Sequence, residues 1–226
     1  MKYQWILFDA DETLFHFDAF AGLQLMFSRF NQQFERQHYQ DYQNTNLALW
    51  DAYQAGQINA QQLQEQRFTH WANKLAVPAQ HLNQAFLEAM ADICKLLPGA
   101  KDLLDSLKDK VKLGIITNGF TALQQIRLER TGLSGYFQTL VISEQVGVAK
   151  PAKAIFEHAF EQMQQPNRQQ VLMVGDNPHS DIQGGINAGI DTCWLNREQQ
   201  PLPQGIQPKH QVASLQELQH WLHQPH

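Results

Sequence analysis

The sequence predicts an α/β fold, a doubly wound parallel sheet with an inserted all-helical cap. Short apolar runs typical of buried strands alternate with helical patterns, and this alternation favours parallel βαβ units. One interval, residues 17–91, contains no convincing strand and is about four times as long as an ordinary crossover, which predicts an inserted module. With 226 residues the chain is long enough to bury a full hydrophobic core.

Five apolar runs are expected to form the sheet. The first is Trp-Ile-Leu-Phe at residues 5–8, where bulky apolar side chains favour a buried strand. The other strands are expected at residues 111–116, 140–142, 171–174 and 192–195, and helices between them at 101–108, 123–130 and 152–163. Each of these crossovers has about the length that a βαβ unit requires.

Apolar side chains in the inserted interval repeat at helical spacing. They recur every three or four residues, at Phe20, Leu23, Phe27, Phe30 and Phe34. This spacing predicts one apolar helix face, and we expect these aromatic rings to be core residues. Further helices are expected at residues 42–53, 61–75 and 81–93, with breaks at Gly56 and at Val77-Pro78.

The C-terminal part begins with a segment rich in Gln and Pro. Residues 197–213 are expected to form a surface loop, and Ser214 with Glu217 predicts a capping box for a short final helix. The expected domains are an α/β catalytic core at residues 1–15 and 93–226 and a helical cap at residues 16–92, inserted after the first strand.

Composition and charge favour a small-molecule enzyme of the cytoplasm. The formal net charge is −5 and there is no basic block, which argues against a nucleic acid polymer as partner. The two cysteines, Cys94 and Cys193, lie far apart, so no disulfide framework is expected. No apolar run approaches the roughly 18 residues of a membrane span, and no signal peptide is recognisable. The sequence gives no indication of the oligomeric state.

Polar motifs follow several of the predicted strands. Asp9 and Asp11 come directly after the first strand, and Thr117-Asn118-Gly119 follows the second. Lys150-Pro151 precedes a helix, and the fourth strand runs into Asp176 and Asp181. Because parallel strands deliver their carboxyl ends to one edge of the sheet, these side chains are expected to share one site.

The four aspartates in these motifs call for a compensating cation. Crowded carboxylates repel one another and have raised pKa values unless a metal ion or Lys150 neutralises them. An all-oxygen donor set suits Mg²⁺, and Mn²⁺ is a plausible substitute. Zinc is not expected, because His179 is the only imidazole in these motifs and a lone His in a polar loop is more often a surface residue.

The ordered motifs Asp-x-Asp-x-Thr, Thr-Asn-Gly, Lys-Pro and Gly-Asp-x-x-x-x-Asp resemble those of the haloacid dehalogenase-like hydrolases. The resemblance covers nearly the whole chain and implies a Rossmann-like core with the helical insert as its cap. Residues 8–15, 115–120, 124–132 and 142–151 further resemble the bacterial pyrimidine 5'-nucleotidase branch. That branch removes phosphate from nucleoside monophosphates such as dUMP, UMP and dTMP, and from non-canonical analogues.

The resemblance implies roles for the residues at the predicted site. Asp9 would be the nucleophile that forms an aspartyl-phosphate, and Asp11 the general acid and base. The carboxylates of Asp9 and Asp176 and the backbone carbonyl of Asp11 would bind Mg²⁺.

The resemblance also implies a phosphate-binding set. Thr117, the backbone N–H of Asn118 and Lys150 would contact the phosphoryl oxygens, together with the nucleophile Asp9. Asp181 would orient Lys150 or a metal-bound water.

Three alternative functions remain open at this point. A sugar-phosphate phosphatase or phosphomutase needs the same core residues, and the cap would decide between them. A 2-haloacid dehalogenase would use the nucleophile without a metal, but Asp11 and the acidic cluster make little sense for that reaction. A binding module without turnover is disfavoured because Asp9, Asp11, Lys150 and Asp176 are all present.

Overall fold

The computed structural model describes residues 2–224 and divides into two compact units. The first comprises Met1–His16, Lys95–Gly119 and Thr131–His226, and the second comprises Phe17–Cys94 and Phe120–Arg130. The second unit therefore contains residues 120–130 as well as the long insert. The cap boundary expected from the sequence, 16–92, instead assigns residues 120–130 to the core.

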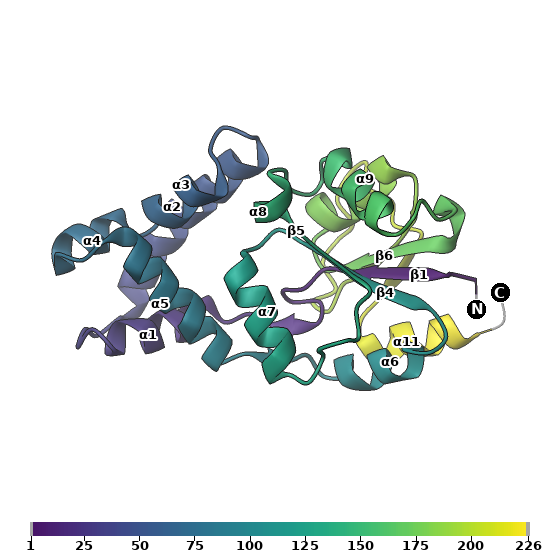
Figure 1. Ribbon diagram of the computed structural model, residues 1–226, viewed down its shortest axis with the longest axis horizontal. Coiled ribbons are helices and arrows are strands. Elements are labelled where there is room, and N and C mark those ends of the chain that lie inside the picture. The colour runs from purple at the N-terminus through teal and green to yellow at the C-terminus, as the bar shows by residue number, and fades with distance from the viewer. Residues whose placement is uncertain (1, 225–226) are drawn as a thin grey trace. The chain divides into compact units, whose positions relative to one another are not determined.

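A parallel sheet forms the centre of the first unit (Figure 1). Within the described residues its six strands run in the order β5-β4-β1-β6-β7-β8. They are β5 (Thr139–Ile142), β4 (Lys112–Thr117), β1 (Trp5–Phe8), β6 (Val171–Gly175), β7 (Asp191–Leu195) and β8 (His210–Val212). All four residues of β1 are buried, because β1 pairs with β4 on one side and β6 on the other. This central place explains why its sequence is a continuous apolar run.

Helices cover both faces of this sheet, as the doubly wound prediction requires. Figure 1 shows α9 (Lys153–Gln162) on one face and α6 (Ala100–Leu107) with α11 (Leu215–His223) on the other. Phe156 and Phe160 of α9 pack against Leu7 in a fully buried cluster. The remaining helical segments of this unit are α8 (Ser143–Val146), η1 (Arg168–Gln170), η2 (Pro178–Ile182) and α10 (Gln183–Ala188).

All five predicted strands are confirmed, with ends that differ by one residue or none. The prediction of a continuous loop at residues 197–213 is wrong, because β8 lies inside it and pairs with β7. His-Gln-Val carries a single apolar residue, so an edge strand of this kind has no visible hydrophobic pattern. The two-residue strands β2 (Phe15–His16) and β3 (Lys95–Leu96) pair antiparallel and were also not expected.

The second unit is helical throughout its regular structure. Its helices are α1 (Ala19–Ser28), α2 (Arg36–Gln54), α3 (Ala60–Gln66), α4 (Thr69–Leu75), α5 (Ala79–Asp92) and α7 (Thr121–Arg130). A cluster of aromatic rings forms its core, in which Phe27 stacks on Phe34 with ring centroids 4.7 Å apart. Gly22 permits α1 to approach α5 closely, since a Cβ there would lie 2.2 Å from Met90 Sδ.

Two details of the helical predictions are wrong. The apolar spacing predicts one helix face that extends to Phe34, but α1 ends at Ser28 and Asn31 adopts a left-handed φ of 54°. Phe34 is buried nevertheless, because the chain reverses and returns it to the aromatic core. The single helix expected at residues 61–75 is two helices, and the break between them lets the consecutive residues Arg67 and Phe68 both be buried.

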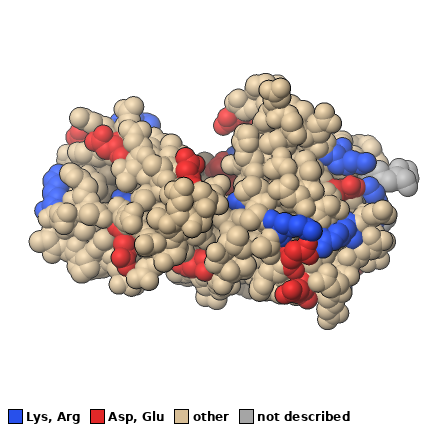
Figure 2. All heavy atoms as spheres, turned by 90° about the horizontal axis from the view of Figure 1, so that it is seen from above, with Lys and Arg blue, Asp and Glu red and all other residues tan. Residues whose placement is uncertain are grey.

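The distribution of charged side chains on the surface agrees with the weak net charge. Figure 2 shows Lys and Arg scattered among uncharged residues on the face in view, with several beside an acidic residue. No helix in the described part of the chain is long and apolar enough to cross a membrane. Cys94 and Cys193 are both described by the structure, and neither forms a disulfide bond.

Candidate active site

The carboxyl edge of the parallel sheet brings the predicted motifs together. β1 ends at Phe8 and delivers Asp9, whose backbone N–H donates to Val174 O of β6 over 2.8 Å. β4 ends at Thr117, and Asp176 directly follows β6. These three strands are adjacent in the sheet, so residues about 160 positions apart in the sequence lie at one edge.

Lys150 is the centre of a buried hydrogen-bonded network. Its side chain is 1% exposed, and its ammonium donates to Asp9 Oδ1 over 2.5 Å, to Asp181 Oδ1 over 2.7 Å and to the Ile116 carbonyl over 2.7 Å. Burial alone would lower the pKa of Lys150, but the charges of Asp181 and Asp9 more than offset it and the net shift is upward. The lysine is therefore a fixed positive charge beside Asp9.

Asp181 is held in place by donors from its own loop. Its Oδ2 accepts from the Asn177 backbone N–H over 3.0 Å and its Oδ1 from the Ser180 hydroxyl over 3.2 Å. The side chain packs on Gly175, where an added Cβ would lie 2.2 Å from Asp181 Oδ2. Glycine at position 175 thus leaves the space that this carboxylate occupies.

Asn118 binds the backbone of Lys150 through its side chain. Its Nδ2 donates to Lys150 O over 2.9 Å, and its Oδ1 accepts from Lys150 N over 2.7 Å. The two bonds join the loop after β4 to the loop that carries Lys150. The sequence motif implies a role for Asn118 through its backbone N–H alone, and this side-chain contact was not predicted.

The variant Asn118→Ala is expected to lose about 1–3 kcal/mol of stability, since two hydrogen bonds of about 0.5–1.5 kcal/mol each are removed. It should also lower kcat more than it raises KM, because Lys150 would be less well positioned. Chemical denaturation and steady-state kinetics measure both effects. Asn187→Ala is the control, because exposed Asn187 donates from its side chain to the Pro151 carbonyl. An equal loss of kcat in both variants would contradict the positioning role.

Thr13 is a site residue that sequence analysis did not single out. Its hydroxyl accepts from the Asp176 N–H over 3.1 Å and lies 3.3 Å from Asp176 Oδ1, as donor to that carboxylate. The residue is fully buried, and Trp194 Nε1 donates to Asp176 O over 2.8 Å from the other side. Thr13 is the last position of the Asp-x-Asp-x-Thr motif, and this position could have marked it as a site residue. Its contact with Asp176, 163 positions away, can be seen only in the folded structure.

Three carboxylates form an acidic cluster. Asp9, Asp176 and Asp181 each offer an oxygen, and these oxygens lie within 4.8 Å of one another. Burial, followed by repulsion from Asp181 and Asp11, raises the pKa of Asp9 to about 7 against the opposing effect of Lys150. Burial and the charges of Asp9 and Asp181 raise the pKa of Asp176 to about 8. An all-oxygen cluster with this excess of negative charge is compatible with a hard divalent cation.

These raised pKa values predict opposite pH dependences for folding and for metal binding. A carboxyl whose folded pKa lies above its unfolded value stabilises the protein at low pH, and this contribution is lost as the pH rises from about 4 to about 8. A metal ion binds the deprotonated form, so its affinity increases over the upper part of the same range.

We therefore expect Mg²⁺ to raise the melting temperature more at pH 8.5 than at pH 6. Up to about a tenfold gain in affinity per pH unit is expected for each proton released. Thermal unfolding with Mg²⁺ and with chelator at both pH values measures this difference. A shift that is as large at pH 6 as at pH 8.5 would contradict protonation of the cluster.

The remaining predicted residues lie outside the hydrogen-bonded network of Lys150 and outside the acidic cluster. The Thr117 side chain is buried, and its hydroxyl has no hydrogen-bond partner within residues 2–224, so it is available to a ligand. Asp11 is half-buried, and its side chain does not belong to the acidic cluster. His179 is exposed and also lies outside that cluster, in agreement with the surface position expected for it.

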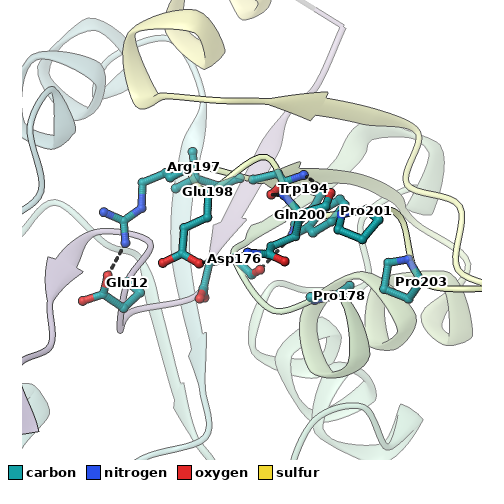
Figure 3. Close-up of a pocket in the computed structure, with 11 residues that line it drawn as sticks. Glu12, Asp176, Pro178, Trp194, Arg197, Glu198, Gln200, Pro201 and Pro203 are labelled. Atoms are coloured by element: carbon teal, nitrogen blue, oxygen red, sulfur yellow. Dashed lines mark hydrogen bonds and ion pairs between the residues drawn. The ribbon is translucent and has the colours of Figure 1, made fainter.

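A pocket of about 370 Å³ adjoins the acidic cluster within the first unit (Figure 3). Asp176 lines it, with Trp194 beside it and Pro178, Pro201 and Pro203 forming rigid walls. Figure 3 shows Arg197 reaching across to an ion pair with Glu12, the residue that follows Asp11. The pocket gives a small molecule access to the edge of the site.

Comparison with known proteins shows full-length similarity. A model of the haloacid dehalogenase-like hydrolases matches residues 3–189. Pyrimidine 5'-nucleotidase YjjG from Escherichia coli (strain K12) is 57% identical over 222 residues, 98% of this chain and 99% of that protein. Pyrimidine 5'-nucleotidase PynA from Streptococcus pneumoniae is 36% identical and covers 96% of this chain and 94% of its own. A crystal structure of the hydrolase YfnB from Bacillus subtilis, bound to magnesium, has 31% identity and a TM-score of 0.86, with 98% of this chain and 99% of that chain covered.

Proposed function

The chain belongs to the haloacid dehalogenase-like hydrolases, and we propose that it is a metal-dependent 5'-nucleotidase acting on pyrimidine nucleoside monophosphates. Its substrates would be dUMP, UMP, dTMP and non-canonical analogues. The observation that carries the proposal is the buried contact of Lys150 with Asp9 and Asp181 beside the acidic cluster. The pyrimidine preference is supported by the relative that is 57% identical over its whole length and bears that activity in its name.

Asp9 is the nucleophile in this proposal. Its carboxylate attacks phosphorus, a P–O bond to Asp9 forms, and the bond from phosphorus to the nucleoside oxygen breaks, which leaves an aspartyl-phosphate. Lys150 fixes Asp9 Oδ1 in position, while Oδ2 accepts no hydrogen bond from residues 2–224 and can attack. Water then attacks the phosphorus of the acyl phosphate, which releases inorganic phosphate and restores Asp9.

Asp11 serves both steps as the proton carrier. In the first step its protonated carboxyl gives a proton to the leaving nucleoside oxygen, and in the second its carboxylate takes one from the attacking water. Asp11 lies near enough to Asp9 for its charge to raise the pKa of that nucleophile, which supports its place beside the reacting atoms.

The phosphoryl group would be held by positive charge and by hydrogen-bond donors. The hydroxyl of Thr117 and the backbone N–H of Asn118 are donors at this edge, and the Lys150 ammonium, which donates to Asp9, Asp181 and the Ile116 carbonyl, supplies positive charge to the transferring group. Asp181 accepts a hydrogen bond from Lys150 and keeps the ammonium directed at the site.

The acidic cluster fits a resident Mg²⁺, with Mn²⁺ as a substitute. The carboxylates of Asp9 and Asp176 and the backbone carbonyl of Asp11 would hold the ion, and the Thr13 hydroxyl would orient Asp176. When bound, the ion supplies positive charge that keeps these carboxylates ionised and reduces their repulsion of the substrate phosphate.

Phosphate release from a panel of substrates tests the proposal. The panel contains dUMP, UMP and dTMP, the purine monophosphates AMP and GMP, and sugar phosphates, each with Mg²⁺, with Mn²⁺ and with chelator. We expect metal-dependent turnover that favours the pyrimidine monophosphates. Preference for sugar phosphates would replace the nucleotidase with a sugar-phosphate phosphatase or phosphomutase, and the absence of turnover on every substrate would contradict an enzymatic role.

We also place the protein in the cytoplasm, with a small-molecule phosphomonoester as its partner. Neither Cys94 nor Cys193 forms a disulfide bond, which supports a reducing compartment. The mild negative charge supports a small substrate in preference to a nucleic acid polymer.

A further inference from the structure

A second pocket, of about 420 Å³, lies entirely among residues of the helical unit. The N-terminal half of α2 contributes His38, Asp41 and Thr45 to its lining. The segment from the end of α3 into α4 contributes Arg67 and Trp71. The proposed phosphatase reaction uses none of these residues.

Arg67 is a buried cation without an anionic partner. Arg67 is 6% exposed, and no carboxylate of the described chain lies within ion-pair distance of its guanidinium. Its Nε donates to Asn83 Oδ1 over 3.0 Å, its Nη2 donates to the same oxygen, and the Tyr42 hydroxyl is its other hydrogen-bond partner within the described chain. Two neutral oxygens, Asn83 Oδ1 and the Tyr42 hydroxyl, thus accept hydrogen bonds from a guanidinium that has five N–H donors.

Three aromatic rings lie close to the guanidinium. Its central carbon lies 5.3 Å from the ring centre of Phe68 and 5.0 Å from those of Phe86 and Phe120. Ring faces attract a cation but do not accept its in-plane N–H groups as an oxyanion does. A buried charge that lacks an anion is costly to the fold, and such groups concentrate at binding sites.

His38 contributes a second donor beside Arg67. Its Nδ1 accepts from the Glu35 backbone N–H over 3.1 Å, which requires the ring to carry its proton on Nε2. The ring stands edge-on to Trp71, with ring centroids 5.3 Å apart and an interplanar angle of 87°. The same packing fixes the orientation of His38 in the wall of the pocket.

We propose that this pocket binds the phosphate group of a small phosphorylated molecule, with Arg67 as the anion anchor and the Nε2–H of His38 as a second donor. The planar fork of Arg67 matches two oxygens of a phosphate. Asp41, the carboxylate among the lining residues of the described chain, accepts a hydrogen bond from a hydroxyl of the same ligand. The ligand is either free inorganic phosphate or a phosphate monoester, and both present the same oxyanion to Arg67.

Calorimetric titration with inorganic phosphate and with UMP, both in chelator so that no turnover occurs, tests this site. The expected result is that Arg67→Met weakens binding of the ligand about tenfold or more. Arg36→Met is the matched control, because Arg36 is an exposed arginine of the same unit that also lies over a phenylalanine ring, 4.7 Å from the centre of Phe20. This control is expected to bind as the unaltered protein does.

Two further variants distinguish binding at this pocket from binding at the proposed active site. Thr45→Trp fills the pocket from an exposed position on α2 and leaves Arg67 in place, so it should also abolish binding at this pocket even if Arg67→Met fails to fold. The proposed active site also offers donors to both probes, so Thr117→Val should weaken only the binding event that remains in Thr45→Trp. Tighter binding of UMP than of phosphate would identify a monoester as the ligand, and the reverse would identify free phosphate. The proposal would be overturned if Thr45→Trp bound both probes as the unaltered protein does, if Thr117→Val removed the binding event that Thr45→Trp abolishes, or if the unaltered protein bound neither probe.

Discussion

The variant Asp9→Asn is expected to lose phosphatase activity by a factor on the order of 10⁴ or more while it keeps its fold. Asparagine has nearly the same volume as aspartate, but its amide is a poor nucleophile and a poor ligand for a divalent cation. Its side-chain oxygen can still accept the hydrogen bond from Lys150, which also retains Asp181 and the Ile116 carbonyl. Phosphate release under saturating UMP and Mg²⁺ measures the loss.

The control for this variant is Asp109→Asn, which changes an exposed aspartate in the turn before β4. Its activity should equal that of the unaltered protein. Circular dichroism and melting temperature establish that Asp9→Asn is folded. Appreciable turnover by a purified, folded Asp9→Asn variant would exclude Asp9 as the nucleophile.

Lys150→Met is expected to impair both stability and catalysis. Removal of the ammonium leaves the carboxylates of Asp9 and Asp181 facing each other in a buried site, and breaking such a pair costs about 3–5 kcal/mol. The same change removes the positive charge that lies beside the transferring phosphoryl group, and the loss of such a group commonly lowers kcat about 10²- to 10³-fold. Denaturant unfolding in chelator and steady-state kinetics with Mg²⁺ measure the two effects.

An exposed lysine of the same unit provides the comparison. Lys153 is 60% exposed and lies 3.3 Å from Glu157, and pairs of this kind contribute about 0–1 kcal/mol. Lys153→Met should therefore be close to neutral in stability and activity. If Lys150→Met were no more harmful than Lys153→Met, the buried network would not be the centre of the site.

The central strands of the sheet could be predicted from the sequence because each is a short run of apolar residues. The run at residues 5–8 is apolar on both faces, since β1 is buried between β4 and β6, and the acids that follow it mark the carboxyl edge. β8 has no comparable signal, because an edge strand with one apolar residue resembles a loop. The break between α3 and α4 is likewise a property of packing that single-sequence periodicity does not contain.

The site was predictable as a set of residue types and not as a set of contacts. Asp9, Lys150 and Asp176 could be grouped because parallel strands place their ends together. The bonds from Asn118 to the Lys150 backbone and from Thr13 to Asp176 join residues that are 32 and 163 positions apart, and they depend on the exact register of neighbouring strands. The burial of Arg67 could not be predicted from the sequence, because a charged residue in a polar helical stretch is ordinarily exposed.

The central claim is that phosphate passes through Asp9, and rapid acid quenching tests it most directly. The protein is mixed with UMP and Mg²⁺, quenched during turnover and digested, and the peptides are analysed by mass spectrometry. We expect a phosphoryl group on the peptide that contains Asp9, dependent on the metal and absent from Asp9→Asn. Phosphorylation of a different residue, or full turnover by Asp9→Asn without any phosphorylated peptide, would contradict the account.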